Sequence, residues 1–326
     1  MWPFTGEAPT LWLALYLLTF ALHAVFVSYV LAGTGYALIQ SLRKADDPIA
    51  ERVRDRLPFM LGCGITAGVG PLLFLQLLYQ RRFYTANLLM GPRWGAVVPA
   101  LIIGFYALYL AKAKTSVRIR RLALAVGTLC FLFVAWSWTE LDQLMQAEPA
   151  WRAMYAAGQR LYGEAAILPR LVLWLGAMLS LFAIVAAHWA SGKERSRLAM
   201  IGLGGRALSV GAAFLLVAAG GALDGNAHGW LYLLIAALTI EAGGWVWMLR
   251  APDGAGLSLV TGAGAAALVC ATVVREAPRL ALLEPARPEA LAAGGFPVFA
   301  VTLVVGVVVI AWIWRAISRA APPRSL

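Results

Sequence analysis

The amino-acid sequence predicts an all-α, polytopic integral membrane protein, and three observations support this fold class. Hydrophobic residues make up 61% of the 326 residues, whereas charged residues make up only 13%. The mean hydropathy is +0.76. The apolar residues also gather in runs of about 20, the length that crosses a bilayer as a helix. Soluble domains carry roughly 25% charged residues, so a soluble protein is not expected.

Nine apolar segments are long enough to span a membrane, and together they predict one transmembrane bundle over residues 1–326. The predicted helices cover residues 10–41, 58–80, 93–112, 120–138, 168–190, 202–222, 228–249, 256–274 and 297–316. A polar link, residues 139–167, separates the fourth helix from the fifth. Its larger apolar residues recur at roughly helical spacing, at Trp151, Met154, Tyr155, Leu161 and Tyr162. This pattern predicts a short amphipathic helix on the outer surface of the membrane.

The net charge of +11 does not indicate a nucleic-acid ligand, because the basic residues lie in short segments between apolar runs. Lysine and arginine in such segments are the usual signal of membrane topology. If the N-terminus is outside, most of the 27 Lys and Arg residues fall on the inner side. The sequence therefore predicts an N-terminus outside and a C-terminus inside.

His23 lies about thirteen residues into the first predicted helix, in LHAVFVSYVLAG (22–33). An ionisable side chain at membrane depth is costly, so it is by default a functional-site hypothesis. A neutral imidazole is a common axial ligand of haem iron in helical proteins. The alternative is a histidine that forms a hydrogen bond to a neighbouring helix, and residue type alone favours this alternative.

Glu241 is a second ionisable residue in an apolar segment, in LTIEAGGW of the seventh predicted helix. A carboxyl group there is expected to be protonated, paired with a cation or next to a hydrated path. Glu241 is therefore a candidate for proton handling. Pairing with an arginine of an inner loop is the alternative.

A polar and aromatic patch ends the second predicted helix and continues into its outer loop, in GPLLFLQLLYQRRFYTANLLMGPRW (70–94). Two consecutive arginines there, Arg81 and Arg82, run against the positive-inside tendency. Guanidinium groups pair bidentately with carboxylates, so both are candidates to bind haem propionates or the acidic surface of a partner. Gln76 is a weaker candidate in the same patch. Arginines that snorkel within an aromatic belt are the alternative.

The run LHAVFVSYVLAGTGYAL around His23 is followed by the Gly-rich GITAGVG (64–70) in the second helix. This combination resembles the start of cytochrome bd oxidase subunit I, and the resemblance covers roughly residues 10–94. It implies that His23 is the axial ligand of a b-type haem iron near the outer face. It also implies a respiratory subunit in a bacterial-type inner (plasma) membrane, with nine helices and the N-terminus outside.

Three features depart from the pattern of that family. The family has carboxylates in its third helix, a second haem-ligating histidine in its fifth, and a quinol site in a long segment after its sixth. Here the third helix has no carboxylate, the fifth has no histidine before His188, and the segment around Leu223–Ala227 is short. We therefore expect at most one or two b-type haems and no reduction of oxygen by this chain itself. Weaker candidates for further cofactor ligands are Met178, His188, His228 and Met248.

These observations leave three functions open. The leading one is a membrane subunit of an electron-transfer complex, an oxidoreductase subunit that works with quinone or other membrane subunits and with a periplasmic partner such as cytochrome c. The second is a haem-free subunit that anchors partners of a complex in the lipid bilayer. The third is a proton-coupled transporter that uses His23 and Glu241.

Overall fold

The computed structural model describes residues 10–43, 47–218, 227–251 and 254–283, together with residues 301, 304, 305 and 308. The chain divides into two units, Met1–Glu284 and Pro285–Leu326. The description below concerns the first unit. Its described residues form α-helices and one 3-10 helix, and no strand occurs among them.

Eight helical segments of the described chain are long and apolar enough to cross a membrane, which confirms a polytopic all-α membrane protein. The long helices are α1 (Thr10–Leu42), α2 (Pro48–Leu78), α5 (Val97–Lys112), α6 (Val117–Leu144), α8 (Ile167–Ala187), α9 (Gly192–Ala218), α10 (His228–Arg250) and α11 (Gly254–Glu276). The short ones are α3 (Gln80–Met90), α4 (Pro92–Gly95), α7 (Glu148–Ala156) and the 3-10 helix η2 (Ala277–Leu282).

Two of the long helices begin well before the predicted apolar runs. Helix α2 starts at Pro48 rather than at residue 58, and the side chain of Asp47 caps it by accepting a hydrogen bond from the Ile49 amide. Helix α9 starts at Gly192 rather than at residue 202. Both helices open with several charged residues, so a hydropathy criterion finds only their apolar parts.

The polar link predicted over residues 139–167 is divided between two helices. Residues up to Leu144 complete α6, and the amphipathic surface helix is the short α7, Glu148–Ala156. The indole of Trp151 in α7 donates a hydrogen bond to the carbonyl of Leu144 at 2.8 Å and so ties α7 to the end of α6.

The ninth predicted helix, residues 297–316, lies outside the described residues except for 301, 304, 305 and 308, which are helical. The last part of the sixth predicted helix, residues 219–222, lies outside them too. Nine spans and the orientation of the N-terminus therefore stay predictions.

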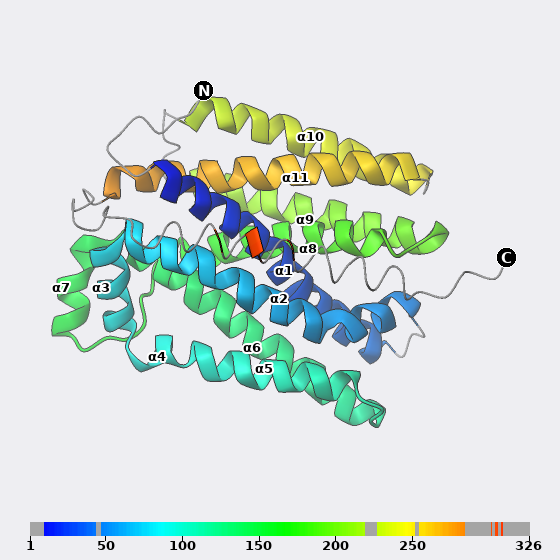
Figure 1. Ribbon diagram of the computed structural model, residues 1–326, viewed down its shortest axis with the longest axis horizontal. Coiled ribbons are helices and arrows are strands. Elements are labelled where there is room, and N and C mark those ends of the chain that lie inside the picture. Colours follow the sequence, from blue (N-terminus) through cyan, green and yellow to red (C-terminus); the bar gives the residue numbers. More distant parts are fainter. Residues whose placement is uncertain are drawn as a thin grey trace. The chain divides into compact units, whose positions relative to one another are not determined.

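Helices that follow each other in sequence pack as antiparallel pairs: α1 with α2, α5 with α6, α8 with α9, and α10 with α11. Helix α1 also contacts α6, α8 and α11, so it joins these pairs into one bundle. In Figure 1 the long helices run in roughly the same direction, while α3 and α7 stand across them at one end. Within LHAVFVSYVLAG of α1, residues 28–32 are buried in this bundle, whereas Leu22 is 53% exposed.

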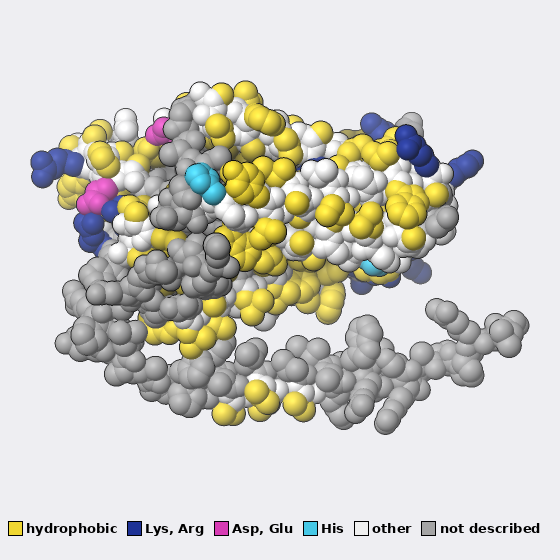
Figure 2. All heavy atoms as spheres, turned by 90° about the horizontal axis from the view of Figure 1, so that it is seen from above, with side chains coloured by type: hydrophobic (Ala, Val, Ile, Leu, Met, Phe, Trp, Pro, Cys, Tyr) yellow, Lys and Arg dark blue, Asp and Glu magenta, His cyan; other side chains and the backbone are white. Residues whose placement is uncertain are grey.

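The two ends of the bundle are named here after buried aspartates. At the Asp142 end, α1, α8 and α10 begin, whereas at the Asp47 end α2, α6, α9 and α11 begin. Figure 2 shows a broad apolar surface along the helices with lysine and arginine side chains gathered at the two ends. Large apolar side chains such as Leu18 (67% exposed) and Phe214 (72% exposed) lie on such surfaces, as expected for helices that face lipid.

Helices α8 and α9 approach closely where two glycines meet. A Cβ atom built on Gly205 would lie 2.7 Å from the carbonyl oxygen of Gly176, and one built on Gly176 would lie 2.6 Å from that of Gly205. Small residues at a helix contact permit this approach in lipid. Gly204, the neighbour of Gly205, has no atom within 4 Å of its built Cβ.

We therefore expect Gly205→Ala to destabilise the protein by about 1–3 kcal/mol, the usual cost of overpacking, because backbone would have to move. The matched control Gly204→Ala should be neutral or slightly stabilising, since alanine favours a helix. Thermal unfolding of the purified protein in detergent would measure both. Equal effects of the two substitutions would contradict the glycine contact.

Candidate functional site

His23 projects from α1 into the contact with α2, opposite the Gly-rich segment 64–70. Its Nδ1 lies 2.9 Å from the carbonyl oxygen of Gly64. A Cβ built on Gly68 would lie 2.8 Å from the His23 ring, and one on Gly70 would lie 3.2 Å from the side chain of Thr19. The glycines of α2 thus provide the room for this face of α1. Two segments that the sequence singled out separately are in contact.

The hydrogen bond to Gly64 determines what the imidazole of His23 can do. A carbonyl oxygen only accepts, so Nδ1 carries the proton and Nε2 keeps a lone pair. The ring is only partly buried in this structure. A histidine that ligates a metal commonly has its other ring nitrogen bonded to a backbone carbonyl or a carboxylate. This arrangement fits an axial haem ligand, and it also fits a plain hydrogen bond between two helices.

Arg81 and Arg82 lie on α3 and bind a carboxylate of their own chain. Arg81 pairs with Glu148 of α7 at 3.0 Å, and Arg82 pairs with the same carboxylate at 2.9 Å. The hydrogen bond from Arg81, together with the charges of both arginines, holds the pKa of Glu148 below its usual value. Gln76 accepts a hydrogen bond from the hydroxyl of Tyr84. These residues join α3 to α7 and α2, and no described contact connects them to His23.

Met178 lies on α8 at about the depth of His23 in the bundle. The ring of Phe20 in α1 contacts Trp174 one turn before Met178, and Tyr29 contacts Phe182 one turn after it. Met178 is partly buried against the central core. Among the weaker candidates, Met178 is therefore the one whose depth in the bundle is closest to that of His23. However, α8 packs against a different face of α1 from the one that carries His23.

The other three weaker candidates lie toward the ends of the bundle. His188 follows α8 at the Asp47 end, and its Nε2 lies 3.0 Å from the hydroxyl of Thr261. Met248 is fully buried near the end of α10, in the same core as Trp245. His228 is exposed at the first turn of α10, at the Asp142 end. All three therefore lie at depths in the bundle that differ from the depth of His23.

Glu241 forms a buried ion pair within the membrane-spanning region. Its two carboxylate oxygens lie 2.9 and 2.8 Å from one nitrogen of Arg206, in α9. Ser180 donates a second hydrogen bond at 2.6 Å, and the indole of Trp245 donates a third at 3.2 Å. The carboxylate is thus compensated in charge and in hydrogen bonds. Arg206 lies in the middle of α9, and the pair matches the expected alternative of an arginine partner.

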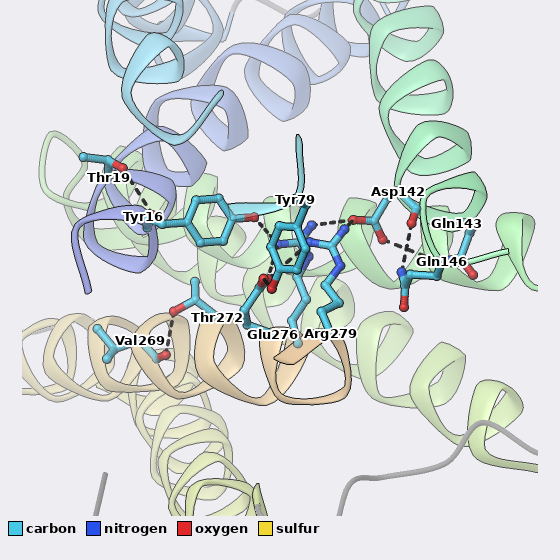
Figure 3. Close-up of polar contacts among 11 residues, drawn as sticks. Tyr16, Thr19, Tyr79, Asp142, Gln143, Gln146, Val269, Thr272, Glu276 and Arg279 are labelled. Carbon is cyan, nitrogen blue, oxygen red and sulfur yellow. Dashed lines mark hydrogen bonds and ion pairs between the residues drawn. The ribbon is translucent and has the colours of Figure 1, made fainter. Parts of the chain in front are cut away.

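Among the described residues, the largest buried polar cluster lies at the Asp142 end, and it was not predicted from the sequence (Figure 3). It joins α1, the residue between α2 and α3, α6, α11 and η2 through two tyrosines, two carboxylates and two arginines. We call it the Asp142 network; its members are Tyr16, Tyr79, Asp142, Arg275, Glu276 and Arg279. All six side chains are nearly or completely buried.

Asp142 is the centre of this network, because both arginines bind it. Arg275 contacts its Oδ1 at 2.6 Å, and Arg279 binds the same oxygen. Arg279 also binds Glu276 at 3.2 Å, and Glu276 accepts a hydrogen bond of 2.5 Å from the hydroxyl of Tyr79. The two positive charges and two negative charges balance, as buried charges must.

The Asp142 network extends toward His23 along α1. The hydroxyl of Tyr16 accepts a hydrogen bond from Arg275 at 3.2 Å. The guanidinium of Arg275 also lies 4.6 Å from the ring centre of Phe20. Because Phe20 precedes His23 by one helical turn, Arg275 lies within about two turns of His23 along the axis of α1.

A sequence signal for this network exists in VVREAPR at the end of α11, where three charged residues directly follow a long apolar run. The predicted helix ended at residue 274, just before them, whereas α11 continues to Glu276 and η2 adds Arg279. Comparison with known proteins gives no further guide, since neither a protein-family model nor a curated protein matches the chain.

Proposed function

We propose that this protein is a membrane subunit of an electron-transfer complex and binds a b-type haem through Nε2 of His23. The observation that supports this most directly is the hydrogen bond from Nδ1 of His23 to Gly64, which fixes the tautomer and leaves Nε2 as the ligating nitrogen. When bound, the haem supplies one-electron transfer. The proposal includes the N-terminus-outside orientation and a bacterial-type inner membrane.

The residues of this chain would have separate tasks in such a site. Gly64 orients the imidazole of His23, and Gly68 leaves space for its ring edge. The Asp142 network, rather than Arg81 and Arg82, provides the charges that lie nearer to His23 along α1. Nearby charge is one of the factors that set a haem reduction potential. Quinone or a periplasmic carrier such as cytochrome c is the proposed redox partner, and Met178, which lies at another face of α1, is not proposed to bind the same haem.

A visible-range absorption spectrum of the purified full-length protein, with and without dithionite, tests this proposal. We expect a Soret band in the wild type, its loss in His23→Gly, and its return when imidazole is added to His23→Gly. The matched control His228→Gly, at an exposed histidine, should keep the wild-type spectrum. A colourless but well-folded wild type would refute the haem assignment.

The second candidate function is a haem-free subunit that anchors partner proteins in the membrane. It is favoured by the close contact of the His23 ring with Gly68 and by the pairing of Arg81 and Arg82 with Glu148, which give all three residues a structural role. This candidate predicts that other chains co-purify with the protein and that His23→Gly leaves the colour of the complex unchanged. The same spectra, recorded on the intact complex, therefore distinguish the two functions.

A further inference from the structure

A cavity of about 690 Å³ lies at the Asp47 end of the bundle, between the last turn of α1 and the first turns of α2 and α6. Sites for small ligands commonly have volumes of roughly 300–1,000 Å³. The polar side chains that line it are Gln40, Ser41, Asp47, Glu51, Arg54, Arg118, Arg120 and Arg121. The cavity is separate from the contact between α1 and α2 that holds His23, so its role does not depend on the haem proposal.

The lining of this cavity carries a surplus of positive charge, because four arginines face two carboxylates. One of these carboxylates, Asp47, binds Arg197 at 2.6 Å and accepts a hydrogen bond from Tyr36 at 2.5 Å. The other, Glu51, is 70% exposed and pairs with Arg54 at 3.3 Å. Asp47 is thus already compensated from outside the cavity, and an anionic ligand would complement the remaining charge.

Two of the arginines are held in place by the surrounding helices. The Nε of Arg121 donates a hydrogen bond of 2.9 Å to the carbonyl of Ser41, which leaves its terminal nitrogens for another acceptor. The side chain of Arg54 is 16% exposed and is held by two carboxylates of its own helix, Glu51 at 3.3 Å and Asp55, whose Oδ1 lies 3.7 Å from the Arg54 Nε. A guanidinium with a fixed plane suits the oxygens of a phosphate group.

Apolar side chains next to the cavity face outward from the same helices. Val117 lines the cavity and is 45% exposed, and Leu122 directly follows Arg121 and is 65% exposed. On α1, Leu42 follows Ser41 and is 57% exposed. A ligand with both a phosphate and apolar chains would satisfy the arginines and these side chains together.

We propose that this cavity binds the headgroup of an anionic phospholipid in the leaflet at the Asp47 end. The cavity lies at the ends of three membrane-spanning helices, where lipid headgroups lie, and basic pockets between such helices are known to bind anionic headgroups. The phosphodiester meets Arg54, Arg120 and Arg121, while the acyl chains follow the outer surface beside Leu42 and Leu122.

The test measures binding of short-chain phosphatidylglycerol to the full-length protein in a neutral detergent, by native mass spectrometry. We expect phosphatidylglycerol to bind more tightly than phosphatidylcholine of the same chain length. The double variant Arg120→Gln/Arg121→Gln, which removes two of the arginines that meet the phosphodiester, should lose about 10- to 30-fold in affinity for phosphatidylglycerol, in line with the effect of two basic groups at a membrane surface. The matched control Lys112→Gln/Lys193→Gln removes two charges at the same end, outside the cavity lining, and should keep the wild-type affinity.

Several outcomes would overturn this proposal. Equal binding of the two lipids, or an equal loss in the control double variant, would mean that the cavity does not recognise the headgroup. Equally tight binding of glycerol 3-phosphate would show a soluble phosphate ligand and refute the lipid assignment. If the arginine variant fails to fold, a photoreactive phosphatidylglycerol decides the question on the wild type. It should label residues 37–43, 47–54 and 117–124, and labelling elsewhere alone would refute the site.

Discussion

Asp142→Asn is expected to destabilise the protein by about 3–5 kcal/mol, the usual cost of removing one partner from a buried ion pair. The substitution keeps the size of the side chain but removes the charge that Arg275 and Arg279 share. Glu276 would then be the one carboxylate of the network left to balance the charges of both arginines. Thermal unfolding in detergent, followed by tryptophan fluorescence, would measure the change.

Glu148→Gln is the matched control for this experiment. Glu148 also binds two arginines and also lies at the Asp142 end, but its side chain is 43% exposed. Exposed ion pairs contribute roughly 0–1 kcal/mol, so its loss should have little effect on stability. If both substitutions had equally small effects, the Asp142 network would not be the buried cluster that the structure describes.

The membrane-spanning helices could be predicted from the sequence because the bilayer sets a simple length requirement. A run of about 20 apolar residues is sufficient to identify a span, and each of the first eight predicted spans overlaps a helix of the described chain. The starts of α2 and α9 could not be found in this way. Their first turns contain charged residues such as Glu51 and Glu194, which pair with arginines near the Asp47 end.

The partners of buried charges could not be predicted, since residue type indicates that a partner is needed but not which residue provides it. Asp142 and Arg279 are 137 positions apart in sequence, and only the folded bundle brings Asp142 of α6 and Arg279 of η2 together. Glu241 shows the same limit: pairing with an arginine is one of the two expectations, but the sequence does not indicate that this arginine is Arg206 of α9. His23 differs, because its partner segment GITAGVG is already noticeable in the sequence.

Breaking the pair of Glu241 and Arg206 should have the second large effect. Glu241→Gln alone leaves Arg206, which is 12% exposed, without its counter-charge, and Arg206→Met alone leaves a fully buried carboxylate. We expect each single substitution to cost about 3–5 kcal/mol. The double variant Arg206→Met/Glu241→Gln should cost less than either, because it leaves no uncompensated charge in the bundle.

The double variant also distinguishes a structural pair from a proton-handling site. Glutamine at position 241 keeps an oxygen that can accept the hydrogen bonds from Ser180 and Trp245, so the local packing should survive. A purely structural pair predicts that Arg206→Met/Glu241→Gln recovers both stability and the activity or binding of the wild type. A proton-handling role predicts a stable double variant without transport or proton uptake in proteoliposomes. Because glutamine cannot carry the proton that glutamate exchanges, recovery of stability without recovery of activity would assign Glu241 to proton handling.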